Sequence, residues 1–322
     1  MPEATTTSRP KDPGLTALRR FAISITAFNI VGYLYLGFEQ AYLTPVAAVL
    51  TAYATSLLLE TVDAWARHRP ARYRGSPVNL VNFLLPAHIA GLACSMLLYG
   101  NDRLLPTVFA VTVAIASKYA LRVRVDGVPR HLFNPSNLGI SVTLLCFSSW
   151  MAIAPPYQFT EYGGAPVDII LPAAILVSGT MLNGKLTRRL PLIAGWLGGF
   201  VVQAVLRGLL FGDSTASALL TMVGVAFILF TNYMITDPVT TPRTPSAQMV
   251  FGAATALVYG ALVVAHITFG LFYALTLVCA GRTVLTWAGQ RRRARRPAPV
   301  LPVPDEEPTP ETAAARVAEP AL

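Results

Sequence analysis

The stretch Phe230-Thr-Asn-Tyr-Met-Ile-Thr-Asp-Pro-Val-Thr-Thr-Pro-Arg-Thr-Pro245 separates two apolar runs, residues 219–229 and a run that begins at Met249. Its three prolines exclude a continuous helix, because proline lacks a backbone N–H and clashes with the preceding turn. Asp237 is therefore expected in a stiff turn between two segments of membrane length. Ionisable groups at a membrane edge are costly, so this carboxylate is a candidate functional residue.

Composition predicts an all-α polytopic membrane protein. Of the 322 residues, 54% are hydrophobic and 13% charged, against a usual charged share of about 25%. Several stretches approach the roughly 20 apolar residues that cross a bilayer as a helix. The net charge of +9 comes from basic residues between the hydrophobic segments, where membrane orientation explains them. The lipid bilayer is thus an expected partner, and nucleic acid is not.

Ten transmembrane helices are predicted within a membrane domain of residues 15–290. Residues 1–14 are polar and expected to be disordered, with no cleaved signal peptide. Residues 291–322 combine a basic anchor with a disordered tail rich in Pro, Glu and Ala. The expected spans are residues 18–38, 45–65, 78–99, 104–120, 138–154, 167–182, 190–210, 218–235, 249–266 and 269–287.

The distribution of Lys and Arg predicts a multi-pass protein of the cytoplasmic membrane with both termini in the cytoplasm. In this orientation nearly all basic residues flank the cytoplasmic ends of the spans, and only Arg103 and Arg207 lie on the other side. Ten spans divide into five plus five, a parity that permits two inverted five-helix repeats, as in many transporters. The sequence echo between residues 76–81 and 217–221 is weak.

Two proline-broken polar motifs, Phe133-Asn-Pro-Ser-Asn137 and Thr236-Asp-Pro-Val-Thr240, are expected at the cytoplasmic ends of spans. One interpretation is two helix caps, since proline restrains the residue before it and Asn and Asp favour turns. The other is a shared cytoplasmic mouth, because irregular backbone is tolerated where it lines a cavity. In that interpretation an ion, a flavin or a polar head group contacts Asn134, Pro135, Asn137, Asn232, Thr236, Asp237 and Thr240.

Isolated polar residues within the spans have two interpretations each. His88 and His266 are each expected to bond a neighbouring helix, with a proton relay or ligation as the alternative. Arg282 lies near enough to a span's end to reach the interface.

The three cysteines, Cys94, Cys146 and Cys279, fall in different segments and lack metal-ligand spacing. They are expected to be buried, inert thiols, with no metal site. No catalytic constellation is predicted, and at most the chain is a non-catalytic subunit of a membrane oxidoreductase.

The two motifs resemble the signature segments of the NqrB/RnfD family. Phe133-Asn134-Pro135 and Thr236-Asp-Pro-Val-Thr-Thr-Pro242 carry the likeness, and Lys118 and the Arg-Arg-Leu-Pro run at 188–191 add to it. It covers most of residues 18–290. Members are membrane subunits of ion-pumping NADH:quinone and ferredoxin:NAD oxidoreductases. The resemblance implies ten helices in two inverted halves and other membrane redox subunits as partners.

One departure from the family concerns covalent flavin. Electron-carrying members attach FMN to the Thr of a Ser-Gly-Ala-Thr type motif after the fifth helix. Here the corresponding loop, residues 155–166, is short, and its only Ser or Thr residue is Thr160. The run Ser178-Gly179-Thr180 lacks the Ala and falls within the sixth expected span. Covalent FMN is therefore predicted to be absent, and non-covalent flavin remains compatible with the chain.

Two classes of function follow from the resemblance. The first is a redox-linked or transmembrane transport role without covalent FMN. The second is a non-redox transporter or accessory protein for natural-product assembly, because short non-flavinylated members resemble the UnbU-type proteins of enediyne biosynthesis. A structural scaffold is a third alternative.

Overall fold

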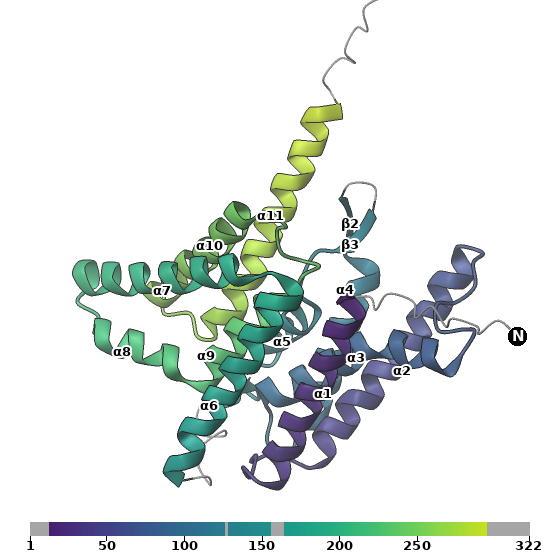
Figure 1. Cartoon of the computed structure of the whole chain (residues 1–322), viewed down its shortest axis with the longest axis horizontal. Helices are drawn as coiled ribbons and strands as arrows, with labels where there is room; N and C mark the ends of the chain where they lie inside the picture. Colours follow the sequence, from purple (N-terminus) through teal and green to yellow (C-terminus); the bar gives the residue numbers. More distant parts are fainter. Residues whose placement is uncertain (1–12, 126–127, 156–163, 295–322) are drawn as a thin grey trace, which may run out of the picture. The chain divides into compact units, whose positions relative to one another are not determined.

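The computed structural model describes residues 13–125, 128–155 and 164–294, and most of this part of the chain is helical (Figure 1). Of the terminal segments 1–14 and 291–322, residues 1–12 and 295–322 lie outside the described part. Pro13 and Gly14, expected to be disordered, instead begin the first helix, and residues 291–294 end the last one. The helices are α1 (Pro13–Leu34), α2 (Leu43–Ala66), α3 (Pro77–Leu97), α4 (Leu104–Ala120), α5 (Pro135–Cys146), α6 (Gly164–Met181), α7 (Leu190–Phe211), α8 (Thr215–Leu220), α9 (Val225–Leu229), α10 (Pro245–Val264) and α11 (Gly270–Ala294).

The expectation of an all-α membrane protein is confirmed. Within the described residues, six helices are long and apolar enough to cross a membrane, or up to seven if the bent pair α8–α9 counts as one span. Large apolar side chains are exposed on these helices, for example Trp65 (81%) and Leu209 (77%). Water would disfavour such surfaces, whereas lipid accommodates them.

Two expected spans differ from their observed form. The helix predicted over 138–154 ends at Cys146, where Phe147 starts a turn that leads into the short strand β4 (Ala152–Ile153). The helix predicted over 218–235 is bent by 65°. Gly224 causes the bend, because its extended backbone (φ −69°, ψ 142°) interrupts the helix.

Two small antiparallel pairs of strands add to the helices. β1 (Leu98–Tyr99) pairs with β4 and so joins the ends of α3 and α5. β2 (Arg122–Val125) pairs with β3 (Val128–His131), with Arg122 opposite His131. This second pair of strands was not predicted. The alternation of Val and Arg around Asp126-Gly127 is a hairpin signal in the sequence.

Polar caps and prolines set several helix starts. Ser76 accepts a hydrogen bond from the Asn79 amide at the start of α3, and Ser214 does the same for the Ser217 amide at α8. Proline occupies the first turn of α3, α5, α7 and α10. Its missing N–H costs nothing there, because the first amides of a helix have no partner within it.

Helices α7 and α10 pack closely side by side (Figure 1). A Cβ on Gly195 would meet the backbone of Met249, and one on Gly199 would lie 2.9 Å from Ala253 Cα. Because the contacting residue numbers rise together, the two helices run parallel. Small residues that allow close backbone approach are the usual means of helix association in membranes.

Gly252→Ala is expected to destabilise the protein by about 1–3 kcal/mol, because overpacking forces backbone shifts. A Cβ at this position would collide with the Leu192 carbonyl oxygen and the Trp196 amide nitrogen. Gly198→Ala is the matched control, since nothing lies within 4 Å of the added Cβ. Unfolding in detergent measures both. Equal stability of the two variants would contradict the close approach.

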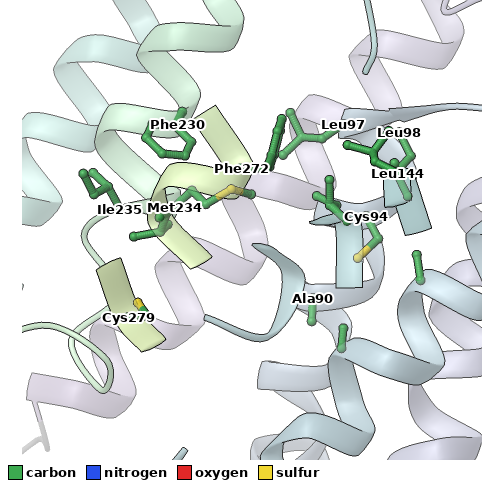
Figure 2. Packing of buried hydrophobic residues seen from close by; sticks show 14 of the residues in the cluster. Ala90, Cys94, Leu97, Leu98, Leu144, Phe230, Met234, Ile235, Phe272 and Cys279 are labelled. Atoms are coloured by element: carbon green, nitrogen blue, oxygen red, sulfur yellow. The ribbon is translucent and has the colours of Figure 1, made fainter. Parts of the chain in front are cut away.

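The buried core links the candidate motifs to the helices. In Figure 2, Phe230, Met234 and Ile235 lie near Phe272, while Cys94 lies near Leu144. Met234 and Ile235 directly precede the polar motif at 236–240, so the apolar end of that segment is anchored in the core.

The chain divides into two compact units, Met1–Thr283 and Val284–Leu322. In the second unit the Arg291 guanidinium lies 3.6 Å from the centroid of the Trp287 ring. This is a cation–π contact at the start of the predicted basic anchor.

Candidate functional site

The candidate site is the turn that follows the π-helix η4 (Phe230–Met234), and we call residues 236–242 the Asp237 turn. The Thr241 amide and hydroxyl both donate to the Asp237 carbonyl oxygen, at 3.2 and 2.6 Å. Thr236 Oγ1 donates back to the Asn232 carbonyl oxygen at 2.7 Å. The predicted stiff turn is therefore observed.

The Asp237 carboxylate is held by its own turn and by the β2–β3 hairpin. Oδ1 accepts from the Val239 amide at 3.1 Å, and Oδ2 accepts from Thr240 Oγ1 at 3.0 Å. His131 Nε2 lies 3.6 Å from Oδ2, and the Asp237 side chain is only 16% exposed. These contacts fit an Asx-type turn to which a histidine from a distant segment has been added.

Burial raises the pKa of Asp237, but His131, the Val239 amide and the Thr240 hydroxyl act in the opposite direction. The pKa lies below its ordinary value of 3.8 as a result. Hydrogen bonds and positive charge favour the ionised form over desolvation here. At neutral pH this site is consequently a nearly buried anion.

Two arginines hold the backbone of the Asp237 turn. Arg189, 6% exposed, donates from Nη2 to the Pro238 carbonyl oxygen at 3.0 Å and from Nη1 to that of Pro242. Arg282 Nη1 donates to the Thr240 carbonyl oxygen. Instead of extending only towards the interface, Arg282 thus has a protein partner in the turn. Burial lowers the pKa of Arg189, whereas the charge of Asp237 acts to raise it.

Asn134 joins the two polar motifs, which are 100 residues apart. Its Nδ2 donates to the Met234 carbonyl oxygen at 2.9 Å. Its Oδ1 accepts from the Asn137 amide at 3.2 Å and from Ser136 Oγ at 2.9 Å, which caps α5. The cap interpretation is therefore confirmed for Asn134, which also contacts the segment that carries Asp237.

Asn137 and Pro135 lie on α5 and serve its packing. Pro135 occupies the first turn of the helix. Asn137 Nδ2 donates to the Phe272 carbonyl oxygen at 3.0 Å and to Thr276 Oγ1 at 2.8 Å, both on α11. These contacts do not include the Asp237 carboxylate. Of the predicted site residues, Asn137 and Pro135 therefore serve the packing of α5 and belong to the site by their sequence motif only.

Asn232 lies within the π-helix η4 and contacts a second π-helix, η2 (Leu182–Thr187). Its carbonyl oxygen accepts from Asn183 Nδ2 at 2.7 Å, and Asn183 Nδ2 also donates to the Gly179 carbonyl oxygen. Gly179 leaves room for the Asn232 side chain, which a Cβ there would overlap. π-Helical turns inside helices are frequent at functional sites.

Lys118 brings a further cation near the site. It lies in the last turn of α4, and its Nζ donates to the Pro86 carbonyl oxygen of α3 at 3.3 Å. Its charge interacts with that of Asp237. The site thus gathers one carboxylate and basic residues from α4, β3, the start of α7 and α11.

His131 and Arg189 were not predicted as contacts of Asp237. His131 lies two positions before the first motif, and Arg189 belongs to the run at 188–191 that carries part of the family resemblance. A nearly buried carboxylate needs a counter-charge. Basic residues in the loops at the membrane edge are therefore the candidates for its partners.

The outcomes for the other polar residues are mixed. His88 bonds two neighbouring helices as expected, through Thr26 Oγ1 at 2.8 Å and Tyr53 OH at 2.9 Å. For His266 the expectation is wrong: α10 ends before it, and it is exposed in a turn with a left-handed backbone (φ 54°). Cys94 and Cys279 are buried as predicted, whereas Cys146, at the end of α5, is exposed.

Fold and site together define an α-helical membrane protein with a charged turn at the edge of its core. A comparison with models of protein families finds no match along this chain. A comparison with curated proteins finds no match either.

Asn134→Ser is expected to cost about 1 kcal/mol, because serine keeps a capping oxygen but loses the amide that reaches Met234. Asn134→Ala removes both the cap and the contact and is expected to cost about 2 kcal/mol. Unfolding in detergent separates the two. If serine is as stable as the natural residue, the contact between the motifs contributes nothing measurable.

Proposed function

We propose that the protein is a membrane subunit resembling the NqrB/RnfD electron-transport subunits, in a redox-linked or transmembrane transport role without covalent FMN. The observation that carries the proposal is the hydrogen bond from Asn134 Nδ2 to the Met234 carbonyl oxygen. It brings together the two segments on which the resemblance rests. Other membrane redox subunits are the partners that this role implies.

The proposed architecture is ten spans in two inverted five-helix repeats, with both termini in the cytoplasm. Each expected span overlaps an observed helix or the bent pair α8–α9, although α5 (Pro135–Cys146) covers only part of the span expected at 138–154. Three pairings of helices recur between the halves. In the first half α1 packs on α3, and α2 packs on α3 and α4. In the second half α6 packs on α9, and α7 packs on α8 and α10. Such recurrence is typical of repeat-built transporters.

The chemistry proposed for the site is charge compensation at the cytoplasmic edge of the membrane domain. Asp237 is an anion with His131 3.6 Å away and the guanidinium of Arg189 close to its turn. A proton, a cation or an electron that passes this position changes the net charge around Asp237. Low-dielectric surroundings make that change large enough to affect the neighbouring turn.

A non-covalent flavin fits one feature of the site. Arg189 Nε is a buried N–H donor with no hydrogen-bond partner among the described residues. A flavin phosphate or ring carbonyl oxygen is an acceptor of the required kind. Bound flavin would supply reversible electron transfer, while Arg189 would orient it and offset its charge.

Covalent attachment has no support in the part of α6 that superficially matches the family motif. Ser178 Oγ is hydrogen-bonded to Tyr233 OH at 2.7 Å, Gly179 is buried against Asn232, and Thr180 is exposed on the helix surface. Most of the loop at 155–166, including Thr160, lies outside the described residues.

A non-redox transporter or accessory protein for natural-product assembly is the second candidate. The observation that favours it is the missing Ser-Gly-Ala-Thr motif, because electron-carrying relatives depend on that attachment site. The same scaffold would then pass a small solute or ion.

An absorbance spectrum of the detergent-purified protein, before and after acid precipitation, tests these alternatives. Flavin released into the supernatant supports the redox-linked role with non-covalent flavin. Flavin retained in the pellet overturns the absence of covalent FMN. A colourless protein whose vesicles catalyse solute or ion flux favours the transporter. A colourless protein without flux contradicts both.

A further inference from the structure

A group of exposed basic side chains lies where α7 and α10 begin. Lys185, Arg188 and Arg243 are all exposed. Among the described residues, no carboxylate lies within 4.0 Å of any of them, in contrast to the paired arginines of the loop after α2. We call these three residues the basic patch.

The basic patch is contiguous because two segments meet at Gln248. One end of the Gln248 side-chain amide lies 3.3 Å from the Arg188 carbonyl oxygen, and the other end lies 3.3 Å from the Arg243 carbonyl oxygen. Arg189, the neighbour of Arg188, donates to the Pro242 carbonyl oxygen, beside Arg243. The backbones at Arg188 and Arg243 thus lie close together, although 55 positions separate the two residues in the chain.

Apolar side chains adjoin the patch on the first turns of the same two helices. Leu190 is 45% exposed on α7, and Met249 and Val250 are 50% and 68% exposed on α10. Because α7 and α10 run parallel, these side chains and the basic patch lie at the same end of the pair. A surface with positive charge at the membrane edge and apolar groups beside it matches a molecule with an anionic head and hydrocarbon tails.

We propose that the basic patch and the adjoining apolar surface bind an anionic phospholipid of the cytoplasmic leaflet. The phosphate accepts hydrogen bonds from Arg188 and Arg243, whose guanidiniums suit phosphate oxygens. The acyl chains lie over Leu190, Met249 and Val250. A free phosphate ion matches the charge but leaves the apolar surface without a partner, so the lipid is the occupant that uses both features.

The test measures the affinity of phosphatidylglycerol and phosphatidylcholine for the full-length protein in a neutral detergent, by native mass spectrometry. Wild type is expected to prefer phosphatidylglycerol. Near a membrane each basic residue contributes about a fivefold gain in affinity for anionic lipid, so the double variant Arg188→Gln/Arg243→Gln is expected to lose about 25-fold. Lys185→Gln alone is expected to lose about fivefold.

The matched control is Arg20→Gln/Arg74→Gln, which removes the same charge from exposed positions on α1 and in the loop before α3. It is expected to change the affinity less than twofold, because exposed charges that lie more than a Debye length from the bound lipid are largely screened. Equal losses in the two double variants, or no preference of wild type for phosphatidylglycerol, would overturn the proposal. Displacement of the lipid by inorganic phosphate, but not by chloride at equal ionic strength, would identify a soluble-anion site and overturn it as well.

Discussion

Asp237→Asn is expected to lower the stability of the protein by about 3 kcal/mol, because it removes the nearly buried carboxylate to which the Val239 amide and the Thr240 hydroxyl donate. The carboxylate is 16% exposed, lies 3.6 Å from His131, and accepts hydrogen bonds from Val239 and Thr240. Asparagine keeps one acceptor oxygen, so the turn is expected to form but to hold the β2–β3 hairpin less firmly. Membrane insertion is expected to be unchanged, since the apolar segments are intact.

Two comparisons isolate the contribution of the Asp237 charge. Asp213→Asn removes a carboxylate that is 43% exposed and 2.8 Å from Arg207, and the expected loss is below about 1 kcal/mol, as for other exposed pairs. A double-mutant cycle with His131→Gln is expected to give a coupling energy of about 1–2 kcal/mol. Loss of membrane insertion in Asp237→Asn, or zero coupling with His131, would contradict the role given to this pair.

The pH dependence of stability follows from the lowered pKa of Asp237. The unfolded carboxyl titrates near 3.8 and the folded one below it. The stabilisation by Asp237 is therefore fully present above pH 3.8 and is lost as pH falls through the folded pKa. Unfolding measured from pH 7 downward should show wild type and Asp237→Asn converging below pH 3.8. A constant difference down to the lowest measurable pH would show that the carboxylate charge is not the cause.

Glu60→Gln is expected to cost about 4 kcal/mol, because it breaks a buried ionic network at the end of α2. Glu60 is fully buried, and its Oε1 accepts from Arg69 Nη1 at 2.7 Å and from the Arg72 amide at 2.9 Å. Its Oε2 accepts from Arg72 Nε and Nη2 at 2.9 and 2.6 Å. Glutamine turns one acceptor into a donor that faces these N–H groups. It leaves the Arg72 guanidinium without its counter-charge and Arg69 with Asp63 alone.

The loop that follows α2 is expected to loosen in the same variant. Hydrogen bonds to Glu60 raise the pKa of both Arg69 and Arg72, which shows how strongly the carboxylate holds these side chains. Trypsin should therefore cleave after Arg72 faster in Glu60→Gln than in wild type, because proteolysis follows local opening. Glu39→Gln changes an exposed glutamate and is the control. Unchanged cleavage after Arg72 would mean that the loop is held by other contacts, such as those of Arg69 with Asp63.

Much of the fold and part of the site follow from local sequence signals. Apolar length located the helices, and prolines located their starts, because both properties act within a few residues of chain. The relation between Asn134 and the segment of Asp237 was also foreseen as two motifs on one face. The 65° bend at Gly224 and the end of α5 at Cys146 were not predicted. Both depend on the segments against which these helices pack.

The sequence by itself determined that this chain is a helical membrane protein with a proline-stiffened carboxylate between two apolar segments, because hydropathy and proline geometry are properties of the local chain. Only the tertiary structure decided which charges accompany that carboxylate. His131, Arg189 and Arg282 approach the Asp237 turn from a hairpin and two helices far away in the sequence. Their convergence depends on how the helices pack, and packing is set by contacts between distant residues that no local pattern encodes.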